Sequence, residues 1–64
     1  MKKPTPEEVK SARLATGLTQ KQAAAVIYKD IRAWQRYEAG DRHMDAALYE
    51  LFLLKTKQIE VDNV

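Results

Sequence analysis

The chain has 64 residues, no cysteine and a formal net charge of +2. This length corresponds to one small domain, and the lack of cysteine excludes disulfides and thiolate metal sites. No apolar run approaches the roughly 20 residues of a membrane span, and the N-terminus has no signal-peptide hydrophobic region. We therefore expect a soluble, intracellular protein.

The basic residues are concentrated in the middle of the chain. Residues 10–42 contain seven basic and three acidic residues, a net charge of +4. Residues 1–9 are balanced, and residues 43–64 contain two basic and four acidic residues, a net charge of −2. This asymmetry favours a polyanionic partner, although so small a total charge also suits an ordinary solvated surface.

The first predicted helix covers residues 6–16. The run Thr5 to Glu8 combines a Thr N-cap, a Pro at the first helical position and a Glu that closes a capping box. Gly17 suits the left-handed position that ends a helix. Residues 1–4 form a short basic arm without periodicity, which we expect to be mobile, with its lysines within reach of phosphate.

Helical spacing places four residues near the inner face of this first helix, namely Val9, Ala12, Arg13 and Leu14. A charged residue among them requires a partner, because a buried, unpaired Arg is energetically costly.

Two further short helices are predicted at residues 20–27 and 31–39. A second capping box, of Thr and Gln, begins the first of them, Asp30 is a suitable N-cap for the second, and Gly40 ends it. Two helices joined so closely can pack only at a steep angle. This is the geometry of a helix-turn-helix, whose second helix is free to enter a DNA major groove.

The helix over residues 31–39 has two distinct faces. Trp34 and Tyr37 are its expected core anchors, which leaves Arg32, Gln35 and Arg36 pointing away from the core. For Trp34 a core position is preferred to a role in stacking on bases.

A fourth helix is predicted at residues 45–56, and it is apolar most of the way round. One small core cannot cover all of its faces, so we expect a two-fold partner. The residues expected at this dimer interface are Leu48, Tyr49, Phe52, Leu53 and Leu54. The alternative is a fifth short element in which the tail, residues 58–64, folds back. The tail is otherwise expected to fray or to be exchanged across a dimer as an edge strand.

The sequence contains no arrangement of residues typical of an enzyme. Its single histidine, His43, lies among charged residues in a predicted loop, and Gly17 and Gly40 are both accounted for as helix ends. No catalytic residues, metal site, cofactor or small-molecule ligand are therefore predicted.

The residues from about Arg13 to Arg42 resemble, without a gap, the Cro- and phage-repressor-like (lambda-repressor-like) helix-turn-helix family. The most characteristic positions are Leu18-Thr19-Gln20, the small residue Ala24, and Glu38-Ala39-Gly40. It implies an all-α, compact four-helix domain. Within the family pattern, Tyr28 stands where a Gly is usual and Lys29 where an apolar residue is usual, and the family's fifth helix is missing.

The resemblance also implies roles for individual residues. Bases would be read by Ile31, Arg32, Gln35 and Arg36. Phosphates would be contacted by Gln20, Lys21, Lys29, Arg42 and His43. Arg13 and Glu38 would form a buried structural pair, which supplies the partner that Arg13 requires.

These roles imply a small transcriptional repressor of phage or prophage type, in the cytoplasm of a bacterial or phage-infected cell. It would bind a short inverted repeat in double-stranded DNA as a homodimer, and it could repress its own operon. Anti-CRISPR-associated repressors are among the small phage regulators of this kind. The alternative is a helical protein-protein interaction module, or an antitoxin-like partner, that uses the helix over residues 45–56.

Overall fold

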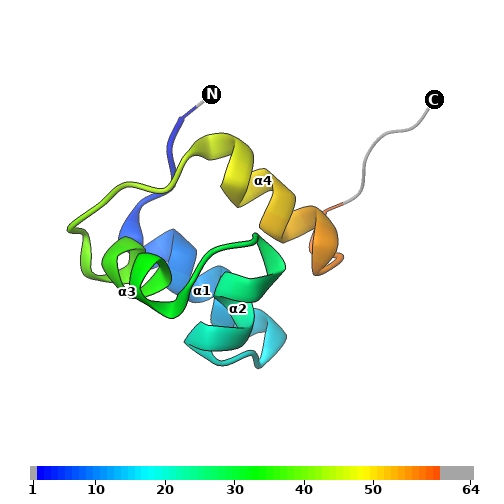
Figure 1. The fold of residues 1–64 in the computed structure, drawn as a ribbon. Helices are drawn as coiled ribbons and strands as arrows, with labels where there is room; N and C mark the ends of the chain where they lie inside the picture. The colour runs from blue at the N-terminus through cyan, green and yellow to red at the C-terminus, as the bar shows by residue number, and fades with distance from the viewer. Residues whose placement is uncertain (1, 60–64) are drawn as a thin grey trace.

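The computed structural model describes residues 2–59, and this part of the chain forms four α-helices and no strand (Figure 1). The helices are α1 (Pro6–Thr16), α2 (Gln20–Val26), α3 (Ile31–Ala39) and α4 (Ala46–Lys55). The prediction of an all-α, four-helix domain is confirmed, with every boundary within one residue of the expected position. The edge strand considered for the tail lies largely outside the described residues.

Each helix begins at a side chain that accepts backbone hydrogen bonds. The hydroxyls of Thr5 and Thr19 each accept the N–H three residues on, at 3.1 Å, and both capping boxes are complete. The carboxylates of Asp30 and Asp45 cap α3 and α4 at 2.9 Å. Because the first N–H groups of a helix have no partner within it, these caps fix where each helix starts.

Left-handed residues end the helices, and two of them are not glycine. Gly17 and Gly40 have φ of 74° and 85°, as expected, whereas Tyr28 and Lys57 have φ of 62° and 60°. At the end of α2 the Lys29 N–H donates to the Ala24 carbonyl at 2.9 Å, which closes a Schellman motif around Tyr28. The turn between α2 and α3 is therefore regular, although a Tyr occupies the position that favours Gly.

The core lies where α1, α2 and α3 meet the inner side of α4. Its largest buried side chains are Trp34 and Phe52, whose rings lie 4.9 Å apart between centroids at 52°. The remaining buried hydrophobic residues are Val9, Ala12, Ala23, Ala24, Ile27, Tyr37 and Met44. The loop residue Met44 is only 1% exposed and fastens the segment between α3 and α4 to the core.

Two expectations about the N-terminal part are wrong. Leu14 is 59% exposed, because it lies about 140° around α1 from the buried Val9 and not on the inner face. The arm is not free over its whole length either, since Pro4 is buried and holds the backbone next to Lys3 against the domain.

The inner side of α4 is covered within the chain itself. Phe52 is fully buried, so its assignment to a dimer interface is wrong: the monomer core already holds it. Four other residues pack partly against the core, namely Leu48, Tyr49, Leu51 and Leu53, and Leu54 is half-buried. After α4 the chain turns back, and the Gln58 amide donates to the Ala12 carbonyl of α1 at 3.0 Å.

Candidate nucleic-acid interface

The outer face of α3 is polar and open to solvent. Arg32, Gln35 and Arg36 are exposed and line a shallow depression together with Ala39 and Asp41. Trp34 and Tyr37 lie on the opposite side, with 1% and 4% of their surface exposed. The three polar side chains that were predicted to read bases therefore share one face. Ile31, the fourth, is 37% exposed at the start of the helix.

A cluster of hydrogen bonds around the Glu38 carboxylate holds α3 in place. Arg13 of α1 donates to both carboxylate oxygens, from Nε at 2.6 Å and from Nη2 at 3.2 Å. Gln20 of α2 donates to Oε1 at 3.1 Å, and the Trp34 indole N–H donates to Oε2. The expected pairing of Arg13 with Glu38 is present, and three helices meet at this one carboxylate.

The electrostatics of this cluster favour the charged form of Glu38. Burial alone would raise the pKa of the Glu38 carboxyl, but the hydrogen bonds from Arg13, Trp34 and Gln20 outweigh it and lower that pKa. The same contact raises the pKa of Arg13. The pair is therefore ionised at neutral pH, in a place where only 8% of the Glu38 side chain is exposed.

Gln20 connects the buried cluster to the exposed face of α3. Its amide nitrogen donates to Glu38, and its amide oxygen lies 3.5 Å from Nε2 of Gln35. The second contact is at the outer limit of a hydrogen bond, so it orients Gln35 only weakly. The resemblance implied that Gln20 touches the DNA backbone and braces the helix over residues 31–39. Its hydrogen bond to Glu38 of α3 agrees with the bracing role, and the contact with the DNA backbone stays a prediction.

The residues expected to contact phosphate divide into two groups. Lys29, Arg42 and His43 are exposed and line one cavity beside α3, whereas Lys21 does not contribute to it. Lys3 of the arm and Tyr37 of α3 also line this cavity. The sequence did not predict Tyr37 at this position. Sequence patterns gave no signal for it, because Tyr37 was already accounted for as a core residue.

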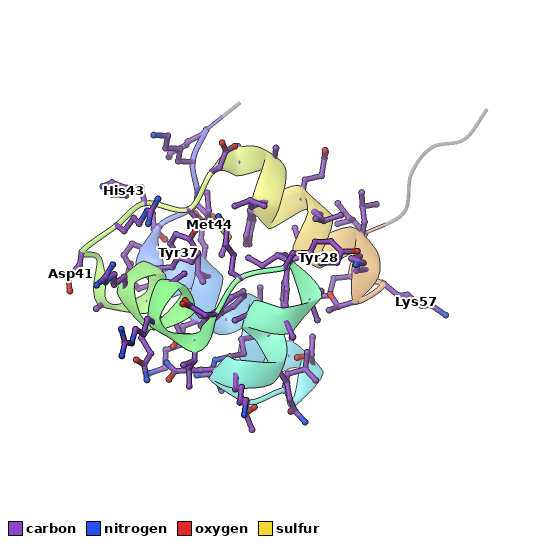
Figure 2. The ribbon with its side chains drawn as sticks, viewed as in Figure 1. Tyr28, Tyr37, Asp41, His43, Met44 and Lys57 are labelled. Atoms are coloured by element: carbon purple, nitrogen blue, oxygen red, sulfur yellow. The ribbon has the colours of Figure 1, made fainter. Side chains whose placement is uncertain are left out.

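A contact between α4 and the turn holds the left-handed Tyr28. The Lys55 ammonium donates to the Tyr28 hydroxyl at 2.6 Å and to the Val26 carbonyl at 3.2 Å, and it lies 4.1 Å from the centre of the Tyr28 ring. Figure 2 shows Tyr28 beside the end of α4. The tyrosine itself is 78% exposed, so the contact is made at the surface.

A metal cluster requires several ligating side chains close together, and a membrane span requires a long apolar helix. Residues 2–59 contain no group of three His, Cys, Asp or Glu side chains that could hold a metal ion. Across the same residues, no helix is both long and apolar enough to span a membrane.

Comparisons of the chain with protein-family models and with curated proteins found no match. The site is therefore interpreted from its own residues and geometry.

Proposed function

We propose that this chain is a sequence-specific, DNA-binding transcriptional repressor of the helix-turn-helix type, with α3 as its recognition helix. One observation carries the proposal: α3 holds Trp34 and Tyr37 in the core and presents Arg32, Gln35 and Arg36 to solvent on the other side. A helix that bound another protein would expose apolar anchors on this face. This one exposes side chains that donate hydrogen bonds.

These side chains suit the edges of bases in the major groove. The guanidinium groups of Arg32 and Arg36 match the O6 and N7 atoms of guanine, and the amide of Gln35 matches N6 and N7 of adenine. The surrounding cations, Lys29 and Arg42, would contact phosphates and fix the register of the helix without reading sequence.

A two-fold homodimer on an inverted repeat is the assembly that suits such a module. The half-buried residues Leu48, Tyr49, Leu53 and Leu54 of α4 would lie at its interface. Sedimentation velocity in the presence and absence of DNA tests the assembly. A stable monomer in solution, with one monomer per bound site, would remove the homodimer from the proposal and leave the recognition helix standing.

The decisive experiment selects bound sites from random duplex DNA and then titrates variants on the selected site. Arg32→Ala should weaken binding to that site by about 1–3 kcal/mol and relax the preference at one base pair. Lys29→Ala should weaken binding to the selected and to random duplexes alike, and lower the salt slope by about one unit.

Lys10, which is exposed on α1, provides the control, since Lys10→Ala removes the same charge from a residue that lines neither the depression on α3 nor the cavity beside it. If Arg32→Ala lowers the affinity for all sequences equally, α3 does not read bases through that residue. If selection recovers no preferred sequence, specific DNA binding itself is refuted.

A further inference from the structure

The cavity beside α3 brings together basic residues from three separate segments. Lys3 comes from the arm, Lys29 from the turn before α3, and Arg42 and His43 from the loop after it. Figure 1 shows the arm passing the loop that leads from α3 to α4, and Figure 2 places His43 on that loop, close to Tyr37. Residues so distant in sequence meet here because Pro4 and Met44, which flank the site, are both buried.

The lining is suited to an anion. Lys3, Lys29 and Arg42 are positive and Asp45 is negative, which leaves a net charge of +2 with His43 neutral. Leu48 of α4, which the proposed homodimer would place at its interface, completes the lining, so the phosphate site lies at the margin of that interface. The Asp45 carboxylate already accepts the Ala47 N–H at 2.9 Å as the cap of α4. The cavity has a volume of about 260 Å³, many times the roughly 30 Å³ of one water molecule, so it has room for a group with several oxygens.

The Tyr37 hydroxyl is the second indication of a ligand. The side chain is only 4% exposed, and its hydroxyl forms no hydrogen bond with any residue in the described part of the chain. Every fully enclosed side-chain nitrogen or oxygen in that part does have a partner. The hydroxyl is therefore reached by solvent, and Tyr37 is one of the residues that line this cavity. A buried tyrosine usually gives its O–H a partner, and a bound oxyanion would provide one.

We infer that this cavity binds one backbone phosphate of a DNA duplex, with Tyr37 donating its hydroxyl hydrogen and Lys3 closing the site from the arm. The inference rests on the proposed function. It adds Tyr37 as a phosphate ligand, and of the two arm lysines expected to reach phosphate it assigns Lys3 to this site. The cavity lies against α3 itself, since Tyr37 belongs to that helix and Lys29 and Arg42 flank it, so a phosphate held here would fix the position of α3 on the duplex.

Two substitutions test the inference in different ways. Tyr37→Phe removes a hydroxyl but no charge, so duplex affinity should fall about tenfold while the salt slope and the thermal stability stay at wild-type values. Lys3→Gln removes a cation, so affinity and salt slope should both fall, the slope by about one unit. Lys2→Gln is the matched control, because Lys2 is a neighbouring exposed lysine that does not line the cavity.

The inference is overturned if Tyr37→Phe binds DNA as well as wild type, or if Lys3→Gln has no larger effect than Lys2→Gln. A role of the Tyr37 hydroxyl in folding alone would instead lower the melting temperature.

A second experiment identifies the source of the phosphate. Inorganic phosphate, added at constant ionic strength and compared with chloride, should shift the amide NMR signals of Lys3, Lys29, Arg42 and His43 and spare those of Arg32 and Gln35. An added duplex should displace it. If phosphate binds but duplex does not displace it, the site takes a free anion and the inference is wrong.

The two proposals can fail separately. A wild-type chain that binds no duplex at any salt concentration refutes the proposed function, whatever happens with inorganic phosphate. A chain that binds duplex, but in which Tyr37→Phe and Lys3→Gln have no specific effect, refutes only the phosphate site.

Discussion

The chain joins its helices through a charged group in two places, and the two differ mainly in burial. At Glu38 a carboxylate that is 8% exposed receives hydrogen bonds from Arg13, Gln20 and Trp34, on three helices. At the turn, the Lys55 ammonium meets Tyr28, a residue 78% exposed. Water can replace the second set of contacts but not the first. The same kind of interaction is therefore structural in one place and nearly dispensable in the other.

The two contacts position α3 in different ways: one is made to the helix itself and the other to the turn before it. The Glu38 cluster fixes the rotation of the helix and so determines which side chains face outward. The contact of Lys55 with Tyr28 acts on the turn that precedes the helix. Rotation of α3 should therefore resist single surface substitutions, whereas the turn should respond to them.

Breaking the Glu38 cluster should have the largest effect on stability. Arg13→Met alone, or Glu38→Leu alone, should lower the free energy of unfolding by about 3–5 kcal/mol, because each leaves a charge that is largely shielded from water without its partner. Replacing both residues in one variant should recover much of that loss. Urea or guanidinium melts of the three variants provide the measurement.

If both single variants unfold near the wild-type midpoint, solvent must reach the pair, and the contrast between the two regions disappears. A double variant as unstable as the sum of the singles would show that the hydrogen bonds from Trp34 and Gln20, not the ion pair, hold the cluster together.

Acid should act on the same cluster with a smaller effect. The pKa of Glu38 is lowered by its hydrogen bonds, so its ionised form contributes stability that is fully present above the ordinary pKa of a glutamate. That contribution is lost as pH falls through the lowered pKa of the folded state. Glu38→Gln should have a lower free energy of unfolding than wild type at neutral pH, and denaturant melts at several pH values should show this difference shrinking in acid. If the difference does not change with pH, ionisation of Glu38 is not the source of the acid sensitivity.

The sequence predicted the helix boundaries well because their causes are local. Capping residues and glycines act on the backbone next to them, so Thr5, Thr19, Asp30 and Gly40 were informative without any knowledge of the fold. The outward face of α3 followed for a similar reason, since Trp34 and Tyr37 are too large and apolar to be left in water.

Apart from Leu14, which helical geometry alone places off the inner face of α1, the errors concern contacts made by residues far apart in sequence. Pro4 and Met44 gave no periodic signal, yet both are buried where α3 meets the segments around it. Phe52 was indistinguishable from its apolar neighbours on α4 until Trp34 was seen against it. The cavity beside α3 also depends on such contacts, since it joins Lys3 of the N-terminal arm to residues 29–48, which a helical pattern cannot reveal.

The smallest effects are expected at the two left-handed residues that are not glycine. Lys57 ends α4 at φ 60°, and its side chain makes no hydrogen bond within the described residues, so Lys57→Gly should relieve backbone strain and stabilise the protein by roughly 1 kcal/mol. Tyr28→Gly relieves the same strain at φ 62° but also removes the contact with Lys55, worth at most about 1 kcal/mol at the surface. Tyr28→Gly should therefore gain less stability than Lys57→Gly, and the difference between their melting temperatures measures the surface contact. Equal gains would mean that this contact contributes nothing to stability. A clear loss of stability in Tyr28→Gly would mean that the exposed contact is far stronger than its solvent exposure allows.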